Sequence, residues 1–383
     1  MFLHPLLECN PTLVDTALTL YREGRIPPNS YILDIDRISE NATALAAAAR
    51  QSGISLYFMT KQIGRNPIAS RAIVEAGISK AVAVDPVEAL LLADQGVLLG
   101  HVGHLVQVPP YYLDKILSYQ PEVMTVFSVE AAANISEAAR KRGIVQKLLL
   151  RVVRDGDYLY DAQHGGLAFE SLAAIAEQIA NLANVTIAGV TSFPSLIVEG
   201  GVAKPTRNFE TLCLATDVLR KLGIAIEQIN APSVTSVSTI PTLAHLGATH
   251  GEPGHALTGT TPLHTVKGQT EVPAYLYITE VSHVCEGESY VFGGGYYPRG
   301  KAQNALVCPK VGSPKLAKAV MPDAQSIDYY LKVEGEFPVG TPVIFAFRTQ
   351  MFVTRANVVP VIGASSSRPH VEGIYNVEGK QMK

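Results

Sequence analysis

A regular alternation of strand-like and helix-like patterns between residues 54 and 251 most strongly limits how this chain can fold. Short apolar runs rich in β-branched and aromatic residues are separated by stretches with helical spacing of apolar positions. The ends of the predicted strands fall near Lys61, Val84, Gln107, Phe127, Val153, Ser192, Asn230 and Gly251. Eight strand ends separated by helices predict an α/β fold, a parallel TIM-like (β/α)8 barrel. A Rossmann sheet is the alternative, but no GxGxxG motif follows the first strand;.

The pattern differs on both sides of this barrel. After about residue 262, apolar and polar residues alternate with period two and turn residues separate the runs, which predicts a C-terminal antiparallel β domain;. Residues 1–24 show helical spacing, and "SYILDID" (30–36) has the pattern of a strand that can join either part;. We therefore expect three regions: an N-terminal helix and strand over 1–34 associated with the β domain, the barrel over 35–262, and the β domain over 263–383.

Composition excludes several classes of protein. Hydrophobic residues make up 47% of the 383 residues and charged residues 17%, so a large core is expected and disorder is not;. The net charge of −3, without a long basic run, argues against a nucleic-acid partner;. Four scattered cysteines indicate a reducing cytoplasm;. The N-terminus lacks the early basic residues of a signal peptide, and the uncharged run 95–113 is too polar to span a membrane;.

The first predicted barrel strand ends at a lysine. In "ISLYFMTKQIGRNP" (54–67), the apolar run is followed by Lys61, Gly64 and Pro67. The carboxyl end of a barrel strand is where α/β enzymes keep their chemistry. A lysine there can lose hydration, so that its pKa falls and it can form a Schiff base with a carbonyl. An ordinary solvated lysine is the alternative.

Three other predicted strand ends carry polar residues. In "THGEPGHALTG" (249–259), Glu252 precedes Pro253 and Gly254, and a glycine there lets the backbone approach an anion such as a phosphate;. The segment "INAPSVTSVS" (229–238) has hydroxyl residues suited to cap a following helix, namely Ser233, Thr235 and Ser236;. Ser192 lies in "VTSFPS" (190–195). Ordinary turns and helix caps are the alternative functions of these residues.

These segments carry a resemblance to a known family. "LYFMTKQIGRNP", "DAQHGGLA", "AGVTSFPS", "NAPS" and "GEPGHALTG" resemble, in order and spacing, the alanine-racemase-like, fold-type III pyridoxal-phosphate enzymes. With "FGGGYYPRG" and "SIDYY", the whole chain resembles the YhfX-type branch of that superfamily. The resemblance implies a (β/α)8 barrel with a C-terminal β domain. It also implies a homodimer with shared active sites and a small-molecule amino-acid substrate.

The resemblance also implies which residues bind pyridoxal 5'-phosphate. Lys61 falls where the family forms its Schiff base with the cofactor, and Arg65 takes the place of a phosphate-contacting tyrosine;. Ser192 falls where relatives have a histidine packed on the cofactor ring. The full set of expected cofactor-binding residues is Lys61, Arg65, Ser192, Ser233, Glu252, Gly254 and His255.

Glu252 separates two possible reactions. Alanine racemases have an arginine at this position, whereas the basic-amino-acid decarboxylases of the same fold have a glutamate before the same Pro-Gly pair. A carboxylate beside the pyridine nitrogen keeps a proton on it, which makes the ring a stronger electron sink. The position therefore favours decarboxylase-like chemistry, although the family resemblance favours a racemase.

The C-terminal domain departs from each subgroup of the family. The decarboxylases' Cys-Asp pair is replaced by Ala324 and Gln325, and the zinc-dependent members' His-x-Cys pair by Arg348-Thr349-Gln350, so no metal is expected;. The racemases' second-base tyrosine aligns with a glycine run that two tyrosines follow. The candidate catalytic residues are Lys61, Tyr296, Tyr297, Asp328 and Arg348.

Two histidines suggest a metal motif that we do not expect to form. His101 and His104 are three residues apart on a predicted strand, so their side chains should face opposite sides;. The leading functional hypothesis is a racemase-like or epimerase-like enzyme that acts at Cα of an amino acid through a Lys61 Schiff base. An amino-acid decarboxylase is the alternative. A non-catalytic pyridoxal-phosphate carrier is the alternative from another class, but such carriers lack the β domain.

Overall fold

The computed structural model describes residues 1–266, 268–323, 325–366 and 368–382. The chain forms two compact units. The first, here called the β unit, comprises Met1–Thr43, Thr60–Ala76 and His255–Lys383. The second, the barrel unit, comprises Ala44–Met59 and Gly77–Gly254. The domain limits expected at residues 34 and 262 stay predictions, because compactness does not test which segments fold alone.

Eight parallel strands close into a ring in the barrel unit. The ring follows the chain order from the first strand to the last, and closes through the pairing of the last strand with the first. The strands are β2 (Ser55–Met59), β3 (Lys80–Ala83), β4 (Leu98–Val102), β5 (Val123–Val126), β6 (Gln146–Val153), β8 (Val185–Thr191), β11 (Gln228–Asn230) and β12 (His250–Gly251). The predicted (β/α)8 barrel is therefore confirmed.

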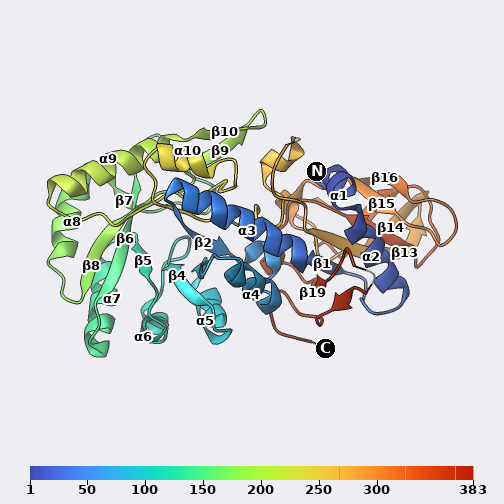
Figure 1. The fold of residues 1–383 in the computed structure, drawn as a ribbon, viewed down its shortest axis with the longest axis horizontal. Coiled ribbons are helices and arrows are strands. Elements are labelled where there is room, and N and C mark those ends of the chain that lie inside the picture. The colour runs from blue at the N-terminus through green and yellow to red at the C-terminus, as the bar shows by residue number, and fades with distance from the viewer. Residues whose placement is uncertain (267, 324, 367, 383) are drawn as a thin grey trace. The chain divides into compact units, whose positions relative to one another are not determined.

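Helices connect the strands, and Figure 1 shows α5 to α9 around them. Their starts are set by local chemistry: Asp85 caps α5 by accepting from the Glu88 amide at 2.7 Å, and Ser128 caps α7 by accepting from the Ala131 amide at 3.1 Å;. The helices are α5 (Pro86–Asp94), α6 (Pro110–Ser118), α7 (Val129–Arg142), η2 (Phe169–Ser171), α8 (Leu172–Ala180), α9 (Arg207–Lys221) and α10 (Ile240–His245). Shorter strands complete the unit: β7 (Leu167–Ala168) beside β6, and the hairpin of β9 (Leu196–Glu199) and β10 (Val202–Pro205).

Strand register decides which side chains fill the barrel interior. Arg151 on β6 is in register with Thr191 on β8, and Thr191 with Asn230 on β11. Residues in register on parallel strands point to the same face, so these three polar side chains form one layer at the carboxyl ends of the strands. Leu149, two residues earlier on β6, faces the same way and packs with Val123 and Ala188. The barrel is therefore apolar in its middle and polar at its carboxyl-terminal end.

The β unit is built on a mostly antiparallel sheet, as the sequence predicted. Strand β1 (Ser30–Asp34) pairs antiparallel with β13 and parallel with β19 in this sheet. Six strands close into a ring through the pairing of β13 with both β14 and β18. The C-terminal strands are β13 (Tyr275–Cys285), β14 (Glu288–Phe292), β15 (Asn304–Val307), β16 (Lys315–Val320), β17 (Tyr330–Glu334), β18 (Pro342–Phe345), β19 (Asn357–Ile362) and β20 (His370–Val371).

The helical pattern at the N-terminus forms two helices, α1 (Leu3–Cys9) and α2 (Pro11–Arg22). They are separated because Asn10 accepts a hydrogen bond from the Leu13 amide at 3.3 Å and Pro11 cannot continue a preceding helix;. Their apolar faces pack in one core cluster with residues of β13 and β18 such as Leu276 and Ile344. The remaining helices are α3 (Ile35–Ser52), η1 (Lys61–Ile63), α4 (Pro67–Glu75), η3 (Pro262–Thr265), η4 (Pro298–Gly300) and η5 (Met351–Val353). Within the described residues, no helix is both long enough and apolar enough to cross a bilayer.

Candidate active site

Lys61 opens the short helix η1, two residues after β2 ends at Met59. The following turn needs a glycine: Gly64 has a left-handed φ of 59°, and a Cβ there would lie 2.6 Å from Cγ2 of Val358;. The turn is therefore held tightly against β19 of the β unit. Lys61 is half-buried at the start of this turn.

Arg65 ends the same turn and is buried in the β unit. Its guanidinium lies 5.1 Å from the centroid of the Phe352 ring, within the range of a cation–π interaction;. The nearby Gln62 amide donates to Gln350 Oε1 at 3.4 Å. The turn after Lys61 is thus packed on residues 350–352.

His255 and Arg348 meet in the β unit. Arg348 Nε donates to His255 Nε2 at 3.2 Å. Loss of hydration, together with the positive charges of Arg348 and Lys61, holds the pKa of His255 well below its ordinary value;. The imidazole is therefore neutral and accepts the arginine's hydrogen bond. The charges of Lys61 and Arg348 therefore both act on His255, and all three are predicted site residues.

Glu252 is only 3% exposed and follows β12 in the barrel unit. Its Oε1 is held by Asn230 Nδ2 at 2.7 Å and by His101 Nδ1 at 2.6 Å. Burial by itself would raise the pKa of this carboxyl group. The charges of His104 and His101, with the hydrogen bonds from His101 and Asn230, outweigh burial and lower the pKa to about 2;. The carboxylate is therefore ionised at neutral pH.

The second oxygen of Glu252 has a different environment. Oε2 is buried and has no hydrogen-bond partner among the described residues, and His104 Nε2 lies 3.8 Å away. The backbone of Glu252 is fixed because its amide donates to Thr235 Oγ1 at 3.1 Å. A buried anionic oxygen without a donor is costly unless a ligand supplies one. Oε2 is therefore suited to accept a hydrogen bond from a bound cation.

The prediction that His101 and His104 face opposite sides is wrong. Strand β4 ends at Val102, and Gly103 turns the chain with a positive φ of 83°. The two rings consequently lie 5.0 Å apart, and both approach Glu252. Their ligand atoms and a Glu252 oxygen lie within 4.8 Å of one another, which is close enough for a metal ion. Both ring nitrogens of His101, however, are already hydrogen-bonded, one to Glu252 and the other to Thr125 at 2.5 Å.

The loop after β11 does not form the helix cap that we expected. Helix α10 begins at Ile240, beyond the three hydroxyl residues named above, and Ser233 instead donates to the Leu196 carbonyl at 2.7 Å. Ser233 and Val234 have positive φ values of 110° and 51°. A β-branched residue rarely adopts this conformation, and such strain is found most often at functional sites. The loop therefore stays at the carboxyl end of the barrel as a candidate phosphate-binding element.

The end of β8 adds two buried hydroxyl groups. Thr191 and Ser192 are almost completely buried, and neither side-chain oxygen has a hydrogen-bond partner in the described part of the chain. The Ser192 carbonyl accepts from Ser195 Oγ at 3.1 Å, which fixes the backbone. Ser192 thus lies at the predicted end of the barrel, with its hydroxyl group available to a ligand.

Arg151 on β6 is a residue that the sequence analysis missed. It is 1% exposed, donates from Nη2 to the Gln163 carbonyl at 2.9 Å, and lies 4.9 Å from the centre of the Phe127 ring. Its Nε and Nη1 have no hydrogen-bond partner among the described residues. Burial lowers the pKa of Arg151 to about 10. The signal in the sequence was a single charged residue inside the apolar run "LLLRVV" (148–153).

The C-terminal candidates surround a glycine run. Asp328 accepts from the Gly294 amide at 3.1 Å and pairs with Arg355 at 2.8 Å, so the structure gives it a role in holding the run. Tyr296 is buried and donates to the Pro298 carbonyl at 3.2 Å, whereas Tyr297 is half-buried. Catalytic roles for these three residues stay predictions. Ala324 lies outside the described residues.

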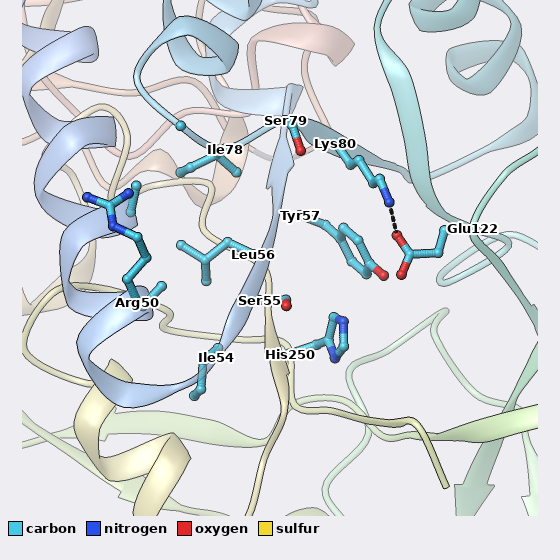
Figure 2. A pocket seen from close by; sticks show the side chains of 13 residues that line it. Arg50, Ile54, Ser55, Leu56, Tyr57, Ile78, Ser79, Lys80, Glu122 and His250 are labelled. Carbon is cyan, nitrogen blue, oxygen red and sulfur yellow. Dashed lines mark hydrogen bonds and ion pairs between the residues drawn. The ribbon is translucent and has the colours of Figure 1, made fainter. Parts of the chain in front are cut away.

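A separate cavity of about 270 Å³ lies at the amino-terminal ends of the barrel strands (Figure 2). Lys80 forms an ion pair with Glu122 at 2.5 Å. Gln228 Nε2 donates both to the Tyr57 hydroxyl at 2.9 Å and to Glu122 at 3.1 Å. His250 also lines the cavity, and burial lowers its pKa to about 4. This cavity lies at the opposite end of the strands from Glu252.

Comparison with known proteins places this architecture in a family. The alanine racemase N-terminal domain matches residues 33–262, and the YhfX-like C-terminal domain matches residues 276–371. The chain therefore belongs to the family of proteins with an alanine racemase N-terminal domain. Over its whole length it is similar to the uncharacterized protein YhfX of Escherichia coli (strain K12), with 44% identity and 100% of each chain covered.

Solved structures with the same fold include three kinds of enzyme. D-threonine aldolase from Filomicrobium marinum has a TM-score of 0.67 and 15% identity, covering 93% of this chain and 96% of its own. Alanine racemase of Clostridium difficile 630, in complex with cycloserine, has a TM-score of 0.66 and 15% identity, with 91% and 98% covered. D-threo-3-hydroxyaspartate dehydratase from Delftia sp. HT23 has a TM-score of 0.65 and 16% identity, with 90% and 97% covered. At these identities the likeness shows the fold alone.

Proposed function

We propose that the protein is a pyridoxal-phosphate-dependent enzyme that acts at Cα of an amino acid, with Lys61 as the residue that holds the cofactor covalently. The observation that carries this proposal is the buried carboxylate of Glu252, which Asn230 and His101 hold through Oε1, while Oε2 has no hydrogen-bond partner among the described residues. That oxygen fits a protonated pyridine nitrogen, which is a cationic donor. When bound, the cofactor supplies the electron sink for negative charge at Cα. Glu252 keeps the proton on the ring nitrogen.

Lys61 and Glu252 each follow the carboxyl end of a barrel strand in the chain. Strands β2 and β12 are neighbours in the barrel, and the Met59 amide donates to the Pro253 carbonyl at 2.9 Å. Lys61 follows Met59 by two residues, and Glu252 directly precedes Pro253. In this proposal Lys61 serves as the attachment point and Glu252 as the partner of the ring nitrogen.

The phosphate group needs donors, and the same strand ends offer them. We assign Arg65, Ser233, Gly254 and His255 to the phosphate. Ser192 is assigned to the cofactor ring, since its hydroxyl group has no other partner among the described residues. The strained backbone at Ser233 supports this assignment, because strain is retained where it places a group for binding;.

Two reactions fit this site. A racemase-like or epimerase-like reaction agrees with the alanine racemase domain that spans the barrel. A decarboxylation is favoured by one observation, the ionised Glu252, because a protonated ring accepts more charge from Cα;. A non-catalytic carrier is less consistent with the chain, which continues into a complete β unit.

The direct test is to attach the cofactor and locate it. Purified protein mixed with pyridoxal phosphate should absorb visible light, and borohydride followed by peptide mass spectrometry should find the adduct on Lys61. Lys61→Ala should lose both signals, whereas Lys80→Ala, at the other end of the barrel strands, should keep them. An adduct that persists in Lys61→Ala would refute the assignment. Incubation with amino-acid pools would then separate CO2 release from inversion of chirality.

We further propose a cytoplasmic homodimer in which the β unit contributes to shared active sites. The four cysteines are all free, which suits a reducing compartment;. Tyr296, Tyr297, Asp328 and Arg348 are the candidate contributions of the β unit. Mixing Lys61→Ala chains with Tyr297→Phe chains should restore activity if each inactive chain supplies the residue that the other lacks. If both variants are inactive alone and the mixture also stays inactive, shared sites are excluded.

A further inference from the structure

Unpartnered polar atoms form a continuous series at the carboxyl end of the barrel. They belong to consecutive strands β6, β8 and β11 and to Glu252, which directly follows β12; Arg151, Thr191 and Asn230 are in register, and Asn230 is in register with His250, two residues before Glu252. Among the described residues, the atoms without a hydrogen-bond partner are Arg151 Nε and Nη1, Thr191 Oγ1, Ser192 Oγ, Asn230 Oδ1 and Glu252 Oε2. Buried polar atoms in native proteins are normally paired, so a series of this kind indicates a surface built for a polar ligand.

Arg151 is the positive end of this series. No carboxylate pairs with Arg151 in the part of the chain that the structure describes, and its one hydrogen bond leads to a neutral carbonyl. The charge of a buried guanidinium costs several kcal/mol unless an anion compensates it. The ring of Phe127 offers only a weak cation–π contact;. The missing partner is therefore an anion.

Glu252 is the negative end of the same series. The two residues are separated by three strand-to-strand steps of about 4.8 Å each around the barrel wall. A ligand that spans them carries a positive group toward Glu252 and an anionic oxygen toward Arg151. The planar fork of arginine matches a carboxylate, to which it can donate two parallel hydrogen bonds.

We propose that Arg151 binds a carboxylate group of the amino-acid substrate. This inference deepens the proposed function and rests on it. It assigns substrate recognition to a barrel residue, whereas the arginine that the sequence analysis named as a candidate catalytic residue is Arg348 of the β unit. Arg348 already donates from Nε to neutral His255, while two nitrogens of Arg151 remain for a ligand.

The test uses cofactor-loaded protein and two small probes of equal size. Propionate carries a carboxylate but no amino group, so it cannot react with the cofactor, and propionamide is its uncharged counterpart. Arg151→Gln should weaken propionate binding about 10- to 100-fold in calorimetric titration, as expected for a charge-assisted hydrogen bond, and leave propionamide binding unchanged. Arg151→Lys, which keeps the charge, should lose less.

Arg154→Gln is the matched control. This arginine lies just beyond the end of β6, pairs with Glu210 at 3.1 Å, and should leave propionate binding unchanged. Equal propionate affinity in Arg151→Gln and wild type would overturn the inference. It would also be overturned if Arg151→Gln altered the cofactor absorbance without a probe while propionate affinity stayed intact, because Arg151 would then serve the cofactor's phenolic oxygen. Failure of the cofactor to attach to Lys61 would refute the proposed function itself, which the adduct measurement reports separately.

Discussion

The two ends of the barrel contain similar residues in opposite states. At the amino-terminal end, Lys80, Glu122 and the Gln228 amide nitrogen are bound to one another or to Tyr57, and Gln228 Oε1 is the exception, with no hydrogen-bond partner in the described part of the chain. At the carboxyl-terminal end, polar atoms on four successive strand ends lack partners among the described residues. Buried polar groups thus bind one another at one end, and in the proposed function those at the other end bind a ligand.

The same contrast holds for charge. His250 at the amino-terminal end is neutral, because burial without sufficient compensation lowers its pKa to about 4. Glu252 at the carboxyl-terminal end is charged, because donors outweigh burial and lower its pKa to about 2. Mutations at the first end should therefore alter stability, and mutations at the second end should alter function.

The largest effect is expected at Glu252. Glu252→Ala should lower turnover by about 10²–10⁴-fold, because the ring nitrogen loses its proton-holding partner, with a much smaller change in cofactor affinity. Glu252→Arg should suppress any decarboxylation, since it imitates the alanine racemases. Glu122→Gln, which changes a half-buried carboxylate at the other end of the strands, is the control. The contrast breaks if Glu252→Ala turns over substrate at the wild-type rate.

A second effect concerns stability against pH. The pKa of His250 is about 4 in the folded protein and ordinarily 6.5, so the unfolded chain binds the proton first as pH falls. Stability supplied by the neutral ring is present above pH 6.5 and is lost as pH falls toward 4, by at most about 1.4 kcal/mol per pH unit. Urea denaturation between pH 4 and 7 should show a shallower loss for His250→Gln. Identical slopes would mean that His250 is not buried in its neutral form.

A third effect tests how Glu252 is held. His101→Phe removes one donor to Oε1 and should raise the pKa of Glu252 toward its ordinary value, with turnover lowered about tenfold;. In the wild type, the stability due to Glu252 is present above pH 4.5 and is lost as pH falls toward 2, because the unfolded carboxylate takes up the proton first;. Acid denaturation of His101→Phe should therefore begin at a higher pH. Unchanged acid denaturation and turnover would show that Asn230 alone fixes the carboxylate.

The smallest effect is expected at the Lys80–Glu122 pair. Both side chains are about one-third exposed, so the ion pair is screened by solvent;. Lys80→Met should change the free energy of unfolding by less than about 1 kcal/mol and should leave turnover unchanged. A double-mutant cycle with Glu122→Gln would measure the coupling. A large loss of turnover in Lys80→Met would contradict the separation of the two ends.

Sequence patterns predicted the barrel because strand and helix periodicity is a local property. They also placed the strand ends of β3, β5, β6, β8 and β11 within about two residues, and the position of Lys61 relative to β2 followed from the same pattern;. The end of β4 was placed five residues too late, because Gly103 turns the chain before the apolar run stops. That turn is what brings His101 and His104 together.

The remaining features depend on which strands are neighbours. Arg151 and Glu252 are 101 positions apart in the chain, and they are related only through three strand pairs, the last of which matches Asn230 with His250, two residues before Glu252. Ser233 looked like a helix cap because serine favours that position, yet its backbone adopts a left-handed conformation in a loop;. Local propensity does not report such tertiary constraints.

A crystal structure of the protein with pyridoxal phosphate would test the central claim most directly. We predict continuous density between the cofactor and Lys61 Nζ, and a distance of about 3 Å between Glu252 Oε2 and the pyridine nitrogen. The cofactor should lie at the carboxyl-terminal end of the barrel strands, and the cavity lined by Lys80 and Glu122 should hold none. A cofactor bound elsewhere, or a Glu252 carboxylate turned away from the ring nitrogen, would contradict the account.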